Sequence, residues 1–225
     1  MRHRLRTLII NFKNYERVLG AGSVELARAA DKVAAEVGAE IIVAPPSPTL
    51  ALVASKVNIR VFAQAISPDS GDKTTGAVTA EAVKAAGAVG TLLNHSEARL
   101  PRGELKAALA RSNATGLEVC LCARTSSEAA ILSRLGTKYL AVEPPELIGT
   151  GTAVSTAKPG VVSKTVEAAK KSGYKGRVLC GAGIVTGADV TKAVELGADG
   201  ILVASSVAKA SNWESKVKEL ARSLG

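Results

Sequence analysis

The chain has 225 residues, of which 47% are hydrophobic and 22% charged, so it can bury a core of its own and is not a disordered segment. Aromatic residues make up only 3%, which means that the core is built from Ala, Val, Leu and Ile. The 29 Lys and Arg residues outnumber the 20 Asp and Glu residues, which favours an anionic partner without distinguishing a nucleic acid, a membrane or a phosphorylated metabolite.

Eight short apolar runs recur along the chain. They are rich in Val, Ile and Leu and nearly continuous, a pattern typical of strands buried on both faces of a parallel sheet. The expected strands cover residues 7–12, 40–44, 60–64, 90–94, 118–123, 139–142, 177–180 and 200–204.

Helical patterns fill the gaps between these runs, and several of them end at a glycine suited to a helix C-terminus. The expected helices begin at Ser23, Pro48, Thr79, Ser126, Pro159, Thr186 and at Ser206 or Val207. Eight alternations of strand and helix without a compositional break predict a single α/β domain over residues 1–225, a (β/α)8 TIM barrel with parallel strands. A doubly wound open sheet is the alternative.

Other classes of protein are less compatible with the sequence. No run of about 18 apolar residues occurs, so no transmembrane helix and no membrane partner are expected. Cys120, Cys122 and Cys180 lie in apolar runs without zinc-site spacing, which predicts buried thiols, no metal site and a soluble cytoplasmic protein. The single Met and single Gln point weakly to a heat-adapted source, a thermophile.

Polar and Gly-rich segments follow five of the expected strands. In a barrel these segments share the carboxyl end of the strands, where active sites are built. They are N-F-K at 11–13, N-H-S-E at 94–97, E-P-P-E-L-I-G-T-G at 143–151, G-A-G-I at 181–184 and A-S-S at 204–206.

The first three of these segments, in this order and spacing, resemble the signature segments of the triosephosphate isomerase family, and the resemblance covers the whole chain. C-G-A-G-I at 180–184 and L-V-A-S at 202–205 resemble its compact archaeal branch. The resemblance implies an intramolecular oxidoreductase of glycolysis and gluconeogenesis. Such an enzyme interconverts dihydroxyacetone phosphate and D-glyceraldehyde 3-phosphate through an enediolate, with neither a metal nor an organic cofactor.

The resemblance also implies a role for each polar residue at the strand ends. Glu143 would be the base, and His95 would polarise the carbonyl as a neutral imidazole, for which this family is a known example. Lys13 would stabilise the enediolate and help to hold the phosphate, while Asn11 would orient these groups through hydrogen bonds.

Further residues would support the catalytic groups and grip the phosphate. Glu97 resembles the family's supporting carboxylate near the lysine, and Ser96 resembles a residue that holds the base while the lid is open. Residues 144–151 resemble the mobile lid that excludes water from the site. The substrate-binding backbone groups expected by resemblance belong to Ile148, Gly149, Gly183, Ala204 and Ser205.

Several positions depart from the common family pattern. Glu146 replaces an aromatic residue of the lid, no Tyr or Ser hydroxyl follows the seventh strand, Ser206 replaces a Gly, and Ala65 replaces an Asn or His. How a closed lid is latched in this chain does not follow from its sequence.

The long polar loop at 65–76 resembles the family loop that reaches into a neighbouring subunit, with Thr75 near that subunit's site. This resemblance implies a homo-oligomer, either a dimer or a tetramer. A floppy surface loop is the alternative.

Two other functions are alternatives to this one. Another phosphate-binding barrel, such as a phosphopentose epimerase or an indole-pathway isomerase, would explain the Gly-rich loops but not the three signature segments together. A basic nucleic-acid-binding protein would explain the charge. The basic residues are, however, scattered over the expected helices with almost no interleaved aromatics, so no nucleic-acid partner is expected.

Overall fold

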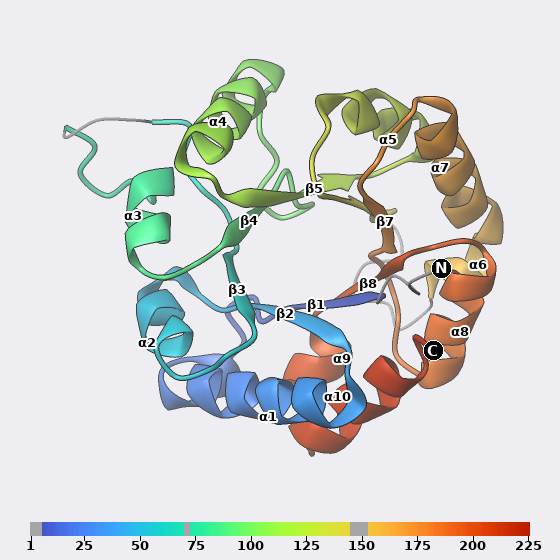
Figure 1. Ribbon diagram of the computed structural model, residues 1–225, viewed down its shortest axis with the longest axis horizontal. Helices are drawn as coiled ribbons and strands as arrows, with labels where there is room; N and C mark the ends of the chain where they lie inside the picture. The colour runs from blue at the N-terminus through green and yellow to red at the C-terminus, as the bar shows by residue number, and fades with distance from the viewer. Residues whose placement is uncertain (1–5, 70–72, 145–152) are drawn as a thin grey trace.

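Eight parallel strands close into a barrel in the computed structural model, which describes residues 6–69, 73–144 and 153–225 (Figure 1). Neighbours in the chain are neighbours in the sheet, and β8 pairs back onto β1. The strands are β1 (Thr7–Asn11), β2 (Glu40–Ala44), β3 (Arg60–Ala63), β4 (Gly90–Leu93), β5 (Glu118–Ala123), β6 (Tyr139–Val142), β7 (Arg177–Cys180) and β8 (Gly200–Val203). This closure confirms the predicted barrel and excludes the open doubly wound sheet.

All eight predicted strands are present, and four of them end one residue earlier than predicted. The residues after these strands are Phe12, Gln64, Asn94 and Ala204. Asn94 shows the physical reason most clearly, because its φ of 61° turns the chain out of the extended conformation that a strand requires. Two of these four residues, Gln64 and Asn94, place polar side chains at the carboxyl end of the barrel.

Helices surround the barrel on its outside (Figure 1). The α-helices are α1 (Ala21–Val37), α2 (Leu50–Ala54), α3 (Ala80–Ala85), α4 (Arg102–Thr115), α5 (Ser126–Leu132), α6 (Val154–Ala157), α7 (Pro159–Lys171), α8 (Gly187–Glu195), α9 (Ser205–Ala208) and α10 (Trp213–Arg222). Short 3-10 helices cover Glu16–Val18, Ser47–Thr49 and Ser133–Leu135. The side chains of Thr79, Thr125 and Thr186 cap α3, α5 and α8.

Three predicted helix starts differ from the structure. The helix expected from Pro48 is a short 3-10 helix from Ser47, which is followed by α2 from Leu50. Helix α1 begins at Ala21 rather than at Ser23, because the Ser23 hydroxyl donates a hydrogen bond of 2.6 Å to the Val18 carbonyl instead of capping the helix. The last predicted helix divides into α9 and α10, and the Asn212 side chain caps the second of them. Helices α4 and α6 were not predicted from the sequence.

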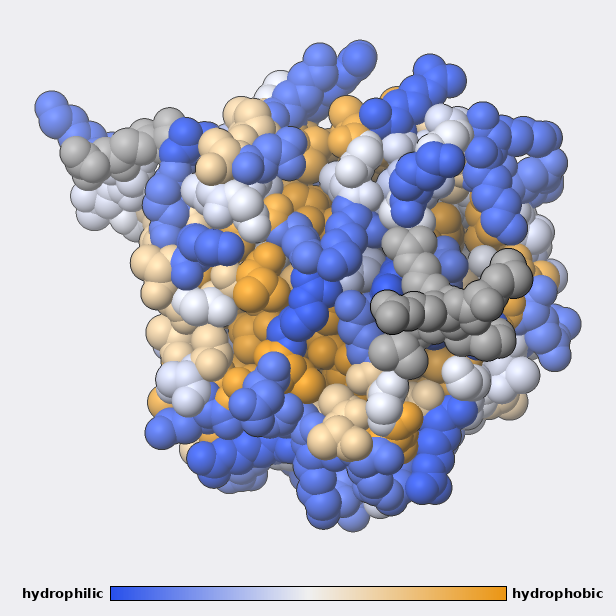
Figure 2. Space-filling model, in the orientation of Figure 1, coloured by the Kyte–Doolittle hydropathy of each residue, from blue (hydrophilic) through white to orange (hydrophobic). Residues whose placement is uncertain are grey.

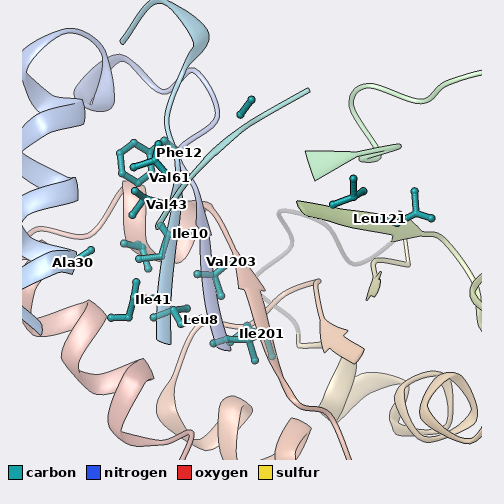
Figure 3. Packing of buried hydrophobic residues seen from close by; sticks show 14 of the residues in the cluster. Leu8, Ile10, Phe12, Ala30, Ile41, Val43, Val61, Leu121, Ile201 and Val203 are labelled. Atoms are coloured by element: carbon teal, nitrogen blue, oxygen red, sulfur yellow. The ribbon is translucent and has the colours of Figure 1, made fainter. Parts of the chain in front are cut away.

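The core has two layers, one inside the barrel and one between the strands and the helices. On β1, Ile9 belongs to the inner layer, while Leu8 and Ile10 belong to the outer one. Figure 3 shows the outer layer, in which Leu8 and Ile10 lie beside residues of β2 and β8. Because each strand is buried on both faces, its sequence is continuously apolar rather than alternating.

The three cysteines are free and buried, as predicted. Cys120 and Cys122 lie inside the barrel, and Cys180 belongs to the outer layer. Within the three described ranges, no helix has the length and apolar character needed to cross a membrane.

Candidate active site

Two adjoining hollows open at the carboxyl end of the strands, which we call the mouth of the barrel. Both are lined by Asn11, Lys13 and His95. The smaller hollow is also lined by Glu143 and by the segments after β7 and β8. The wider one has a volume of about 740 Å³. Residues of the polar segments that follow β1, β4, β7 and β8 therefore converge here as predicted, together with Glu143, which directly follows β6.

Glu143 is the most strongly desolvated carboxyl group at the mouth. It follows β6 directly and is 3% exposed, and its backbone N–H donates a hydrogen bond of 2.7 Å to the Ala123 carbonyl of β5. Burial raises the pKa of Glu143 to about 7, although the Cys122 thiol and the Lys13 ammonium group oppose this rise. A carboxyl group that titrates near neutrality can both accept and release a proton there.

Gly181 provides the space for this carboxyl group. A Cβ atom at Gly181 would lie 2.6 Å from Cγ of Glu143, which is closer than real Cβ contacts allow. The glycine after β7 therefore permits the close approach of the Glu143 side chain, besides opening the loop that follows.

His95 is buried and held in one orientation. Its Nδ1 atom accepts a hydrogen bond of 3.2 Å from the backbone N–H of Glu97, which leaves the proton on Nε2. The Nε2 atom lies 3.5 Å from Oε1 of Glu143. Burial and the nearby Lys13 charge lower the pKa of His95 to about 4, so the imidazole is neutral at pH 7 and its contact with Glu143 is not an ion pair.

Lys13 supplies a positive charge at the mouth. Its Nζ atom lies 2.6 Å from Oε1 of Glu97, and its backbone N–H donates a hydrogen bond of 3.0 Å to Oδ1 of Asn11. The backbone of Lys13 has a φ of 50°, an unusual value for a residue other than glycine. Gln64 Nε2 donates a hydrogen bond of 2.9 Å to the Lys13 carbonyl and so fastens this turn to the end of β3.

The loops after β7 and β8 form the opposite wall of the smaller hollow. Gly183 has a φ of 71°, and it lines the hollow together with Ala204 and Ser205. The Thr186 side chain caps α8 just beyond Gly183, with Asp189 completing a reciprocal capping box. This wall presents backbone groups and small side chains rather than further cations.

Not every predicted site residue has a described partner. Ser96 Oγ and Glu143 Oε2 are buried atoms that have no hydrogen-bond partner within the described part of the chain. Ile148 and Gly149, predicted to bind substrate, lie outside the described residues, as does Glu146. Within the described residues, no group of three or more His, Cys, Asp or Glu side chains is arranged to hold a metal ion.

Two residues that shape the site, Gln64 and Cys122, were not predicted to belong to it. Gln64 is the only glutamine in the chain and directly follows a buried strand, which was an available signal. Cys122 had no such signal, because its contact with Glu143 brings together the ends of two different strands.

Comparison with known proteins identifies the relatives of this chain. A family model described as triosephosphate isomerase matches residues 6–220. Proteins named triosephosphate isomerase are 45% identical in Caldivirga maquilingensis, with 98% of each chain covered, and 46% identical in Pyrobaculum calidifontis, with 98% of this chain and 97% of the relative covered. The protein of that name from Methanocaldococcus jannaschii is 43% identical over 95% of this chain and 97% of its own length. These relatives come from thermophilic archaea, in agreement with the expected branch.

Proposed function

The chain belongs to the triosephosphate isomerase family, and from this premise we propose which of its groups carry out the reaction. The enzyme interconverts the two triose phosphates, dihydroxyacetone phosphate and D-glyceraldehyde 3-phosphate, as an intramolecular oxidoreductase of glycolysis and gluconeogenesis. The reaction moves one proton between two neighbouring carbon atoms, and a second proton between the oxygen atoms that they carry, through an enediolate.

Glu143 is the base in this proposal. Its carboxylate removes a proton from the carbon beside the carbonyl group and then returns the proton to the neighbouring carbon. The observation that carries this role is its pKa of about 7 in a buried position beside His95, since a base with an ordinary pKa would be a weaker proton acceptor. No group other than Glu143 is needed for the proton transfer between the carbon atoms.

His95 is the proposed electrophile. Its Nε2–H donates a hydrogen bond to the carbonyl oxygen and to the enediolate oxygen that replaces it. The Glu97 N–H at Nδ1 supports this role, because it keeps the other ring nitrogen protonated and aimed toward Glu143. A neutral imidazole is also closer in acidity to an enediol than imidazolium is, so it stabilises the developing charge without losing its proton outright.

Lys13 is the proposed cation for the enediolate and for the substrate phosphate, with Glu97 and Asn11 fixing its position. Backbone N–H groups of Gly183, Ala204 and Ser205 are the proposed phosphate ligands, because these residues line the hollow that Lys13 and Glu143 share. Ser96 as a support for Glu143, and Ile148 and Gly149 as further phosphate ligands, remain proposals by family resemblance.

A coupled isomerase assay on the purified chain tests this function in both directions, with 2-phosphoglycolate as the competing ligand. Lys13→Met tests the phosphate role and should weaken 2-phosphoglycolate binding together with turnover, whereas Lys56→Met, an exposed change away from the mouth, should alter neither. Absence of isomerisation by the unmodified protein would refute the proposal. Unchanged 2-phosphoglycolate affinity in Lys13→Met would remove Lys13 from the site.

We further propose that the protein is a homo-oligomer, a dimer or a tetramer, in which a second copy covers the wider hollow. The support is the loop before α3, which projects from the barrel (Figure 1) and carries the exposed Thr75. Apolar side chains are exposed among charged ones on the face of the molecule drawn in Figure 2, and Tyr15, Ile66 and Val78 line the wider hollow. Light scattering over a range of concentrations, with Thr75→Arg as the interface variant, distinguishes monomer, dimer and tetramer.

The cytoplasm is the proposed location of the enzyme. The support is that Cys120, Cys122 and Cys180 are all free thiols, which suits a reducing compartment.

A further inference from the structure

Arg99 lies behind the mouth of the barrel and lines neither of its two hollows, yet its guanidinium group contacts three elements of the fold. One nitrogen donates hydrogen bonds to the Asn94 carbonyl at 3.0 Å and to the Cys122 carbonyl at 3.5 Å. The other pairs with Glu128 near the start of α5. The Arg99 side chain is 27% exposed, so these contacts are largely shielded from water.

The Asn94 carbonyl is close to the reaction because Asn94 directly precedes His95. Asn94 is buried and has a left-handed backbone, with a φ of 61°. Its side-chain amide donates a hydrogen bond of 3.0 Å to the Cys122 carbonyl and accepts one of 3.3 Å from the Leu100 N–H. The segment that carries His95 is therefore fastened to the end of β5.

The end of β5 also holds the base. The Ala123 carbonyl, next to that of Cys122, accepts the 2.7 Å hydrogen bond from the Glu143 N–H. Neighbouring carbonyl groups of β5 thus anchor the segment before His95 on one side and Glu143 on the other. Because Arg99 bonds to the carbonyl groups of both Asn94 and Cys122, it bridges the two segments whose relative position sets the spacing between His95 and Glu143.

We propose that Arg99, held in place by Glu128, is a positioning residue that fixes the position of His95 relative to Glu143 during the reaction. This inference rests on the proposed function. It adds a residue that lines neither hollow and that contacts the site through the backbone carbonyls of Asn94 and Cys122.

The charge of Arg99 acts in the same direction as its hydrogen bonds. The guanidinium group adds to the lowering of the His95 pKa, for which burial and Lys13 are the larger causes. It also opposes the rise of the Glu143 pKa that burial causes, less strongly than the Cys122 thiol and Lys13 do. It therefore favours the neutral imidazole and the ionised carboxylate, which are the two forms that the reaction requires.

The test uses Arg99→Ala, with its kinetics measured in the presence and absence of guanidinium ions. We expect kcat to fall by about 10²-fold, the effect of a misplacement of about 1 Å, while KM and the affinity for 2-phosphoglycolate change by less than about threefold. Added guanidinium should restore part of kcat, because Arg99 lines an open groove of about 760 Å³ through which the ion can enter.

Arg102→Ala is the matched control, since Arg102 is exposed and lines the same groove. It makes none of the hydrogen bonds by which Arg99 joins Asn94, Cys122 and Glu128. It should change neither kcat nor the response to guanidinium. Glu128→Gln should give a smaller loss of kcat than Arg99→Ala, because Arg99 keeps its two carbonyl acceptors. Glu128→Gln also provides the test if Arg99→Ala fails to fold.

Three results would overturn the inference while the unmodified protein remains an active isomerase. These are a folded Arg99→Ala with kcat within twofold, a loss that guanidinium does not reduce, and a loss matched by an equal loss of 2-phosphoglycolate affinity. An inactive unmodified protein would instead refute the proposed function.

Discussion

The two ends of the barrel hold glutamates in opposite electrostatic surroundings, one half-buried and the other buried. At the amino-terminal end, which we call the floor of the barrel, Glu40 accepts hydrogen bonds from the Thr7 hydroxyl at 2.5 Å and from Arg60 at 3.2 Å. Glu40 also pairs with Arg177. Although burial opposes the change, these partners lower the pKa of Glu40. At the mouth, burial of Glu143 outweighs its neighbours and raises its pKa to about 7.

This difference separates groups that stabilise the fold from groups available for chemistry. Tyr139 extends the network of Glu40, Arg60 and Arg177 at the floor of the barrel, which we call the floor network. It accepts a hydrogen bond of 2.6 Å from Arg60 and donates one of 3.3 Å to Glu40. Each partly buried charge of the floor network therefore has several partners. The Glu143 carboxylate has an oxygen without a partner among the described residues, which leaves it free to act on a substrate.

The largest expected effect tests the mouth through Glu143→Gln. Because the amide cannot accept the substrate proton, kcat should fall by about 10³-fold or more with little change in the circular dichroism spectrum. Steady-state kinetics in both directions provide the measurement. Activity within tenfold of the unmodified protein would show that another group is the base.

The next largest effect tests the floor of the barrel through Glu40→Gln. Arg60 and Arg177 would lose their shared carboxylate inside a partly buried network, so the free energy of unfolding should fall by about 3 kcal/mol while kcat stays within about twofold. Urea unfolding measures this loss. Glu25→Gln, a change on the exposed side of α1, is the control and should cost less than about 0.5 kcal/mol. A loss of activity without a loss of stability would contradict the division between the two ends.

A smaller effect concerns stability at the mouth. The pKa of Glu143 is raised in the folded state, so its carboxylate costs stability at high pH, and the cost disappears below the ordinary value of 4.5. The rise to about 7 corresponds to at most about 3 kcal/mol.

Glu143→Gln should therefore be more stable than the unmodified protein by about 2 kcal/mol above pH 7, since the amide removes most of this cost. The gap should shrink as the pH falls from 7 toward 4.5. Unfolding curves measured across this range test the sign, and a gap that widens on acidification would contradict the raised pKa.

The smallest expected effect concerns the protonation state of His95, which is measured with every residue of the site unchanged. His95 should stay neutral down to about pH 4, with its proton on Nε2, because burial and Lys13 disfavour imidazolium. Nitrogen-15 NMR from pH 4 to 8 measures this directly, and His3→Gln leaves His95 as the only histidine signal. Titration near the ordinary value of 6.5 would show that the ring is better solvated than the structure indicates.

Much of the site was predictable because its residues directly follow continuous apolar runs. Lys13, His95 and Glu143 could be placed at strand ends from local patterns alone, and the closed barrel brings all three to one cavity. The contact between Cys122 and Glu143 and the bonds of Arg99 could not be predicted, since each joins the ends of different strands. The floor network left a partial signal in the sequence, because its charged residues Glu40, Arg60 and Arg177 occupy the first positions of strands.

The sequence by itself determined the eight strands, the polar segments that follow them and the family, because hydrophobic periodicity and motif spacing are local properties of the chain. Tertiary structure decided that the ring closes between β8 and β1, and which charges meet inside it. It also gave Glu40 and Glu143 opposite pKa shifts. A pKa depends on burial and on charges brought near by the fold, so neither of the two shifts could be obtained from the residue type or from its neighbours in the chain.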